Sequence, residues 1–150
     1  MTDILKKSIP KAILTAALFT KWWYAVPVDG PDKFYWGFPL AFVGEGFQTS
    51  MSLQVFLLEF VVDFLFYVFC WMVLRQFFKR MNIRHSLNKR IYRATWILSF
   101  LVVSVYSSLV AASSPVIHWK RPYQWNVKAT GYIFIWERTP LVDSKGRVND

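Results

Sequence analysis

The sequence predicts an all-α membrane protein: a three-span transmembrane helical bundle with an aromatic outer loop and a small C-terminal β-hairpin. Three observations support this fold class. Of the 150 residues, 55% are hydrophobic and 19% are aromatic, Lys and Arg outnumber Asp and Glu by 18 to 9, and long apolar runs hold almost no charge. Such a composition excludes a disordered chain. We therefore expect a transmembrane domain over 1–118 and an extracytoplasmic tail over 119–150.

The first predicted span covers 12–28 and contains one charged residue, Lys21. Three lysines precede it, and tryptophans follow Lys21 directly. A cleaved signal peptide has a similar basic start and short apolar run. The residues after Ala16-Ala17 are Leu and Phe, which do not form a favourable cleavage pattern, so we expect a retained spanning helix.

The second and third predicted spans cover 51–74 and 94–117. Twenty of the 24 residues in the second are apolar, and the exceptions are Ser52, Gln54, Glu59 and Asp63. The third lies in a stretch without Asp, Glu, Lys or Arg. As a helix it would be about 35 Å long, which exceeds the roughly 30 Å of a bilayer core.

The segment between these two spans is strongly basic and predicts the orientation. It holds seven cations and no acid: Arg75, Lys79, Arg80, Arg84, Lys89, Arg90 and Arg93. Positive loops stay in the cytoplasm, so we expect a plasma (inner) membrane protein with a cytoplasmic N-terminus and an extracytoplasmic C-terminus. Nucleic-acid binding is the alternative for such a cluster, but the segment has no binding motif and joins two spans. Anionic lipid headgroups are therefore the expected partner.

Two aromatic segments are expected outside the membrane. An outer loop carries Phe34, Tyr35, Trp36 and Phe38 among Gly and Pro residues, which favours an interfacial position. A recognition surface for a membrane partner is the alternative. Further on, Tyr123–Lys128 and Tyr132–Arg138 are typical of strands, and Thr130-Gly131 predicts the turn of a hairpin between them.

Lys21, Glu59 and Asp63 form the predicted intramembrane charge cluster. Glu59 and Asp63 are four residues apart and therefore share one helix face. Lys21 comes to a similar depth if the first span is antiparallel to the second. Because charge is costly in hydrocarbon, these groups must face protein, water or each other. They either fix the register of the bundle or bind a charged residue of a partner span, or they relay a proton or cation.

The third span carries Ser104, Ser108 and Ala112 at four-residue spacing, which predicts a helix-packing seam. No catalytic motif is present, and the only cysteine, Cys70, excludes an internal disulfide and a multi-cysteine metal site. His85 and His118 fall on opposite sides of the membrane in this topology. We therefore expect no catalytic residues, no metal and no cofactor.

The sequence favours a non-catalytic accessory or assembly subunit of a larger membrane complex. Small size, acids that exceed their internal partners and the aromatic loop support it. A membrane-protein partner or self-association is then expected, and nucleic acid is not. The alternative function is a small proton- or cation-coupled transporter or channel that uses Glu59 and Asp63.

Overall fold

In the computed structural model, the described residues are 2–27, 31–47, 52–81, 89–134, 136–137, 141–142 and 148–149. They form three helices: α1 (Thr2–Leu18), α2 (Leu57–Arg80) and α3 (Lys89–Ala112). The strands are β1 (Phe19–Pro27), β2 (Lys33–Trp36), β3 (Val43–Glu45), β4 (Leu53–Phe56), β5 (Val116–His118), β6 (Trp125–Phe134), β7 (Leu141–Val142) and β8 (Val148–Asn149).

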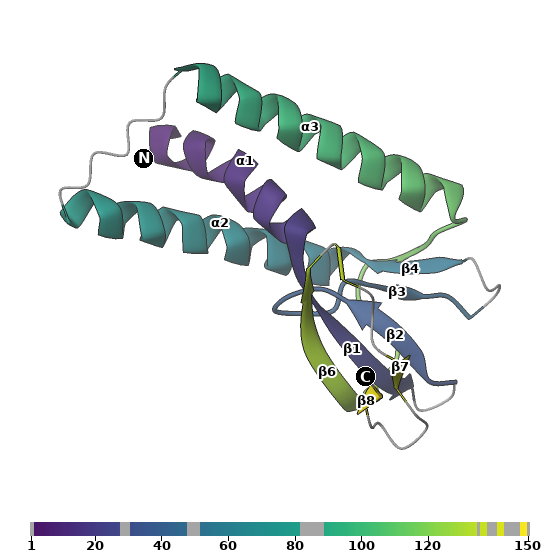
Figure 1. Ribbon diagram of the computed structural model, residues 1–150. Coiled ribbons are helices and arrows are strands. Elements are labelled where there is room, and N and C mark those ends of the chain that lie inside the picture. Colours follow the sequence, from purple (N-terminus) through teal and green to yellow (C-terminus); the bar gives the residue numbers. More distant parts are fainter. Residues whose placement is uncertain are drawn as a thin grey trace.

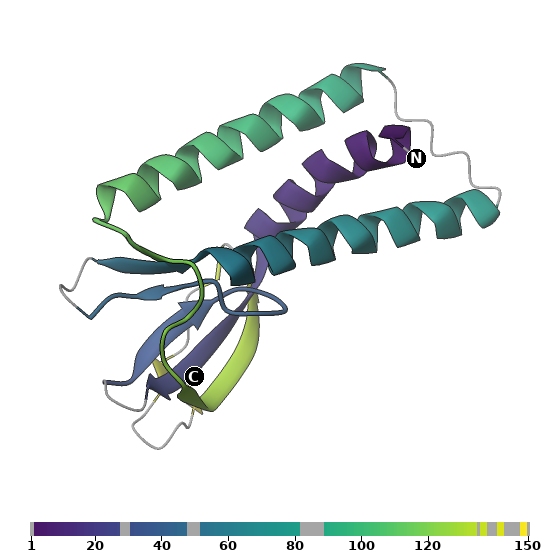
Figure 2. The same cartoon turned by 180° about the vertical axis from the view of Figure 1, so that it is seen from behind.

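The helices lie side by side, and a six-stranded sheet lies at one end of them (Figures 1 and 2). The strand order is β5-β4-β3-β2-β1-β6, and β7 pairs with β8 separately. All neighbours in the large sheet are antiparallel except β4 and β5, which are parallel. A parallel pair needs a long crossover, and here α2 and α3 together provide it.

The expected all-α bundle of three spans is therefore wrong, because much of the apolar sequence forms a mixed sheet. The predicted span 12–28 divides at Leu18 into the end of α1 and the whole of β1. From Phe19 onward the residues are mainly aromatic and β-branched, which fit a pleated surface better than a helix. A short apolar run does not by itself distinguish a buried strand from a helix.

The other two predicted spans are displaced along the chain. The segment 51–74 contains β4 before α2 begins at Leu57, and α2 continues to Arg80. The segment 94–117 lies mostly in α3, which begins five residues earlier at Lys89 and ends at Ala112. These two helices are long and apolar enough to cross a membrane, and they are the two candidates among the described residues.

The predicted C-terminal hairpin is also wrong. One continuous strand, β6, runs through Thr130 and Gly131, and it pairs along its length with β1. Gly131 lies opposite Trp22, and a Cβ at this glycine would collide with the indole ring of that tryptophan. The glycine thus allows close approach of a large side chain and does not form a turn.

Both faces of the sheet are covered by aromatic side chains. On one face Tyr35, Ala25 and Phe56 are buried, and Trp23, Tyr123 and Trp125 pack against them. On the other face the buried residues are Trp22, Tyr24 and Ile133. Consecutive residues of β1 therefore point to opposite faces, as the pleat requires.

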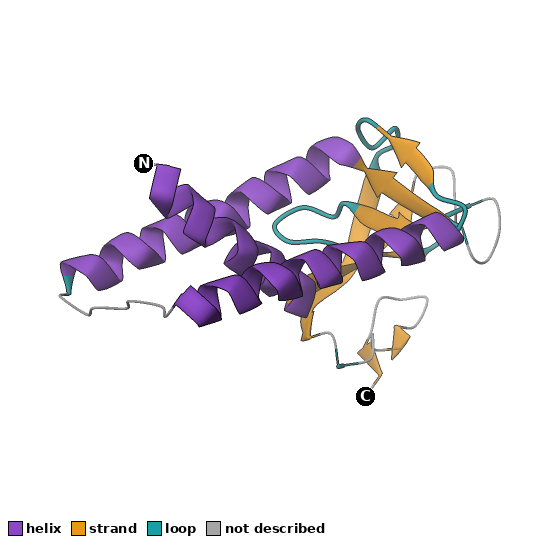
Figure 3. Ribbon diagram, turned by 90° about the horizontal axis from the view of Figure 1, so that it is seen from above, coloured by secondary structure: helices purple, strands orange, loops and turns teal. Residues whose placement is uncertain are grey.

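Helix α1 lies between α2 and α3 and is bound to both by polar contacts (Figures 1 and 3). From α2, Tyr67 Oη donates to the Phe19 carbonyl at 2.9 Å, and Trp71 Nε1 donates to Thr15 Oγ1 at 2.9 Å. From α3, Ser99 Oγ lies 2.9 Å from the Pro10 carbonyl oxygen, and Tyr106 Oη donates to the Ala17 carbonyl at 3.3 Å. The last four carbonyls of α1 lack helical partners, and Tyr106 supplies a donor for one of them, that of Ala17.

A carboxylate joins β1 and β6 near the far end of the sheet. Asp32 Oδ2 accepts hydrogen bonds from Tyr24 Oη at 2.9 Å and from Lys128 Nζ at 3.1 Å. The bond from Lys128, followed by the bond from Tyr24, holds the pKa of Asp32 below its usual value. The folded state therefore binds this proton less readily than the unfolded chain does.

We expect Asp32→Asn to lower the melting temperature at about pH 7 but not at about pH 2. A carboxylate with a depressed pKa stabilises the fold above the unfolded pKa of about 3.9, and this contribution is lost as the pH falls through the folded pKa. Thermal unfolding of the solubilised protein at both pH values measures the difference. An equal loss of stability at both values would contradict the assigned role of this carboxylate.

Candidate functional site

Glu59 and Asp63 lie in the first two turns of α2, at the junction of the helices with the sheet. Their exposed fractions are only 7% and 2%. Asp63 Oδ1 accepts a hydrogen bond of 2.8 Å from the backbone N–H of Leu40, and Glu59 Oε1 accepts one of 3.3 Å from that of Arg121. The two acids therefore connect α2 to two loops that are distant in sequence.

Each carboxyl group also has an oxygen without a partner. Glu59 Oε2 and Asp63 Oδ2 are buried and have no hydrogen-bond partner among the described residues. The two groups are close enough for the charge of Glu59 to act on Asp63. Like charges on neighbouring turns of one helix repel each other, and protonation of either acid would relieve the repulsion.

The structure does not bring Lys21 to these acids. Its side chain leaves β1, where its Nζ lies 3.7 Å from the ring centroid of Trp23 and 5.9 Å from that of Tyr132. Burial lowers the pKa of Lys21. Within the described part of the chain Lys21 forms no ion pair, so its positive charge is balanced by aromatic faces. The expected three-residue cluster is reduced to an acid pair because Lys21 is on a strand and not on a helix.

The predicted aromatic outer loop is instead a strand and a turn within the sheet. Phe34, Tyr35 and Trp36 belong to β2, and Phe38 follows in the turn. The Tyr35 side chain is fully buried and stacks on Phe56, with ring centroids 6.5 Å apart. Phe38 packs against Phe66 of α2, with centroids 5.4 Å apart. These rings therefore form the sheet core and its contact with the helices.

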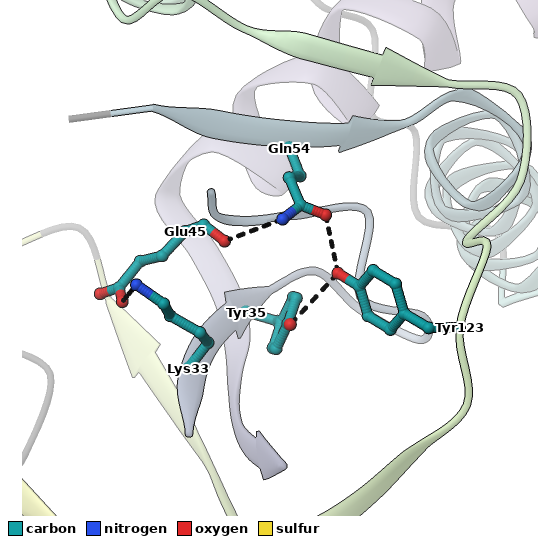
Figure 4. Close-up of polar contacts among 5 residues, drawn as sticks. All are labelled: Lys33, Tyr35, Glu45, Gln54 and Tyr123. Carbon is teal, nitrogen blue, oxygen red and sulfur yellow. Dashed lines mark hydrogen bonds and ion pairs between the residues drawn. The ribbon is translucent and has the colours of Figure 1, made fainter. Parts of the chain in front are cut away.

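A chain of polar contacts crosses the sheet beside Tyr35 (Figure 4). Tyr123 Oη donates to Gln54 Oε1 at 2.8 Å, and Tyr35 Oη donates in turn to Tyr123 Oη at 3.2 Å. Gln54 Nε2 donates to the Glu45 carbonyl at 3.4 Å, and the Glu45 carboxylate faces Lys33 Nζ at 3.7 Å. Burial is the main cause that raises the pKa of Tyr35 and Tyr123. Both phenols therefore stay neutral and serve as hydrogen-bonding groups.

A shallow cavity of about 240 Å³ opens next to this series of polar contacts. Its lining residues are Phe47, Gln54, Val116, His118, Pro122 and Tyr123. The polar atoms of Gln54 and Tyr123 are already engaged with each other, and His118 stacks on Phe56 with ring centroids 6.1 Å apart. No nucleophile and base are placed together here, so this cavity offers no evident chemistry.

The described cations of the predicted basic loop lie at the end of the helices opposite the sheet (Figure 1). Six of the seven are described, and Arg84 lies outside the described residues. The start of α1 lies at the same end and adds three lysines, which the predicted cytoplasmic N-terminus also places on this side. The basic end, as we define it, comprises Lys6, Lys7, Lys11, Arg75, Lys79, Arg80, Lys89, Arg90 and Arg93.

The basic end contrasts with the sheet and its junction. The sequence places a single acid, Asp3, in the helical segments of the basic end. The described sheet and junction contain equal numbers of cations and acids. The five cations are Lys21, Lys33, Lys120, Arg121 and Lys128, and the five acids are Asp32, Glu45, Glu59, Asp63 and Glu137. Between these regions, α2 is uncharged from Phe64 to Leu74 and α3 from Ala94 to Ala112. The molecule is therefore strongly polarised along its helices.

The uncharged middle of α2 and α3 exposes large apolar side chains on several sides. Phe100 is 75% exposed and Phe69 is 60% exposed, and nineteen large hydrophobic residues of these two helices are exposed in all. The predicted seam of Ser104, Ser108 and Ala112 is exposed as well. It does not pack on α1, since α3 contacts α1 through Ser99 and Tyr106.

Sequence reasoning missed the residues that assemble the helices and the junction. Trp71 and Tyr106 donate hydrogen bonds to α1, and Ser99 contacts the Pro10 carbonyl of the same helix. Tyr67 donates to Phe19 at the start of β1, and Gln54 pairs with Tyr123. Their one signal was the presence of polar side chains within apolar runs, which predicts an internal contact without identifying its partner.

Among the described residues, no group of three or more His, Cys, Asp or Glu is placed to hold a metal ion. In comparisons with protein-family models, with curated proteins and with solved structures, nothing matches this chain, so its function is inferred from its own residues.

Proposed function

We propose that the protein is a membrane-inserted, non-catalytic accessory or assembly subunit. In this arrangement α2 and α3 cross the bilayer, the basic end is cytoplasmic, and the sheet stands on the extracytoplasmic side of the plasma membrane. The observation that carries the proposal is the exposed apolar surface of α2 and α3, with nine cations at one end and a balanced set of charges at the other.

Solvation energetics support this arrangement. Monomeric soluble proteins seldom expose large contiguous apolar patches, whereas a lipid environment covers them without cost. Cations at one end of apolar helices agree with the distribution of charge found across bacterial membranes. Aromatic side chains at the junction, such as Tyr132 and Phe134, fit the headgroup region on the other side.

The packing of α3 supports the role of an assembly subunit. Its C-terminal half exposes Ser104, Ser108 and Ala112, although small residues are typical of helix–helix contacts in membranes. Within α3 only Ser99 is buried, and its hydroxyl contacts the Pro10 carbonyl of α1. This leaves a side of α3 available to a transmembrane helix of a partner or of a second copy.

Cysteine labelling tests the membrane arrangement. In a Cys70→Ala background, Met81→Cys at the basic end and Asn126→Cys on β6 are both exposed positions. We expect a membrane-impermeant maleimide to label Asn126→Cys in intact cells and Met81→Cys only after permeabilisation. The Cys70→Ala protein is the control for background. Labelling of both positions from one side would contradict the arrangement.

Co-purification in a gentle detergent followed by mass spectrometry tests the assembly role. We expect a stoichiometric partner chain, and Ser108→Phe should reduce its retention because a bulky ring blocks close helix approach. Phe100→Leu, a conservative change at an exposed position, is the matched control. A homogeneous preparation that retains no partner would overturn this role.

A proton- or cation-coupled transporter is the second candidate, and the unpartnered oxygens Glu59 Oε2 and Asp63 Oδ2 favour it. In that case Glu59→Gln and Asp63→Asn should abolish proton flux in liposomes while leaving assembly intact. The hydrogen bonds of both acids to loop amides favour a structural role instead.

A further inference from the structure

A pair of cations is brought together where α1 crosses α2 near the basic end. Lys11 Nζ lies 4.9 Å from the ring centroid of Trp71, and Arg75 follows Trp71 by one helical turn on the same face of α2. Both cations are partly buried. Burial lowers the pKa of Lys11, and the charge of Arg75 adds to this effect. Two positive charges thus share one site.

This pair has no counter-charge in the described part of the chain. Neither Lys11 nor Arg75 forms an ion pair with an acid there. Apart from Asp3, the other charged residues of the basic end are cations, and the sheet with its acids lies at the opposite end (Figure 1). Like charges that are partly removed from water destabilise the fold unless an anion lies between them.

The surroundings of the pair fit an anion that carries hydrocarbon. Trp71 and Met72 of α2 and Ile9 of α1 pack against the buried cluster of Ala12, Tyr67 and Val68 at the same crossing. Leu74 and Phe77, which lie at a similar level but on other sides of α2, are exposed and apolar. A small hydrophilic anion would leave these apolar groups in water, whereas a lipid with a phosphate group would cover them.

We infer that Lys11 and Arg75 together bind the phosphate group of an anionic phospholipid, whose acyl chains lie along the exposed apolar side of α2. The inference rests on the proposed membrane location and names a partner for it. It differs from a general attraction of the basic end to negative membranes, because it assigns the phosphate to two residues from different helices.

The test compares lipid binding by two double variants of the full chain. Lys11→Gln with Arg75→Gln removes the pair, and Lys6→Gln with Lys89→Gln removes the same charge from exposed positions of the basic end. Delipidated protein in detergent is mixed with phosphatidylglycerol or with phosphatidylcholine of identical chains, and bound lipid is counted by native mass spectrometry. We expect the wild-type protein to bind phosphatidylglycerol about tenfold more tightly than phosphatidylcholine.

The pair variant should lose this preference, with binding of phosphatidylglycerol weakened about tenfold, and the control variant should lose less than about threefold. Equal losses in both variants would show diffuse attraction and overturn the site. Displacement of the lipid by millimolar inorganic phosphate, or by duplex DNA, would overturn it as well, because the occupant would then be a free anion or a nucleic acid.

Thermal unfolding gives a second readout that does not depend on counting lipids. Without anionic lipid, the pair variant should melt at the same temperature as the wild-type protein or higher, because repulsion has been removed. Added phosphatidylglycerol should raise the melting temperature of the wild-type protein only. An equal increase in both proteins would contradict the site.

Resistance of the wild-type protein to carbonate extraction separately reports membrane insertion. Failure of the lipid site and failure of the proposed membrane location are therefore distinguishable.

Discussion

Replacing Phe56 by alanine is expected to lower the free energy of unfolding by about 3–5 kcal/mol. The side chain is 0% exposed and lies where β4 passes into α2. Its ring has neighbours on three sides, with centroids 6.5 Å from Tyr35, 6.2 Å from Tyr123 and 6.1 Å from His118. Truncation would leave a cavity that the backbone cannot close, because the Phe56 N–H is bonded to the Phe42 carbonyl at 2.8 Å.

Denaturant unfolding of the solubilised protein, followed by near-ultraviolet circular dichroism, measures this loss. Phe69→Ala is the matched control, since it removes the same atoms from a position on α2 that is 60% exposed. Its expected cost in detergent is within about 1 kcal/mol. Similar losses in both variants would contradict the assignment of Phe56 to the core that joins sheet and helix.

Replacing Asp63 by leucine is expected to lower the free energy of unfolding by about 1–3 kcal/mol. The change removes the buried oxygen that accepts the Leu40 N–H at 2.8 Å and leaves this donor without its partner. Asp63→Asn keeps an acceptor oxygen at the same place and should cost less. The turn that holds Leu40 should then detach from α2 in the leucine variant only.

Hydrogen–deuterium exchange of the Leu40 amide reports this detachment directly, and thermal unfolding reports its cost. Val61→Leu, an exposed change on the neighbouring turn of α2, is the control for added apolar volume. Glu59→Leu should have a smaller effect, because its bond to the Arg121 N–H is longer, at 3.3 Å. A protected Leu40 amide in Asp63→Leu would show that the carboxylate does not hold the turn.

The candidate site combines residues that are distant in sequence, which explains why prediction reached only part of it. Glu59 and Asp63 stand out because acids are unusual in an apolar run, and their four-residue spacing holds in α2. Their partners do not stand out, since the backbone amides of Leu40 and Arg121 carry no side-chain signal. The pairing of Lys11 with Arg75 likewise depends on how α1 crosses α2.

Composition and charge along continuous segments predict two long apolar helices, their approximate positions and the accumulation of cations between them. They do not predict the sheet. The segments around Trp22, Tyr35 and Ile133 are apolar and aromatic enough for a span, a loop or a strand. Only long-range pairing decides among these. The backbone groups of β1 bond to β2 and β6, and its successive side chains pack into two separate cores on opposite faces of the sheet. The tertiary structure also moved Lys21 away from the acids, because its residue is part of that strand.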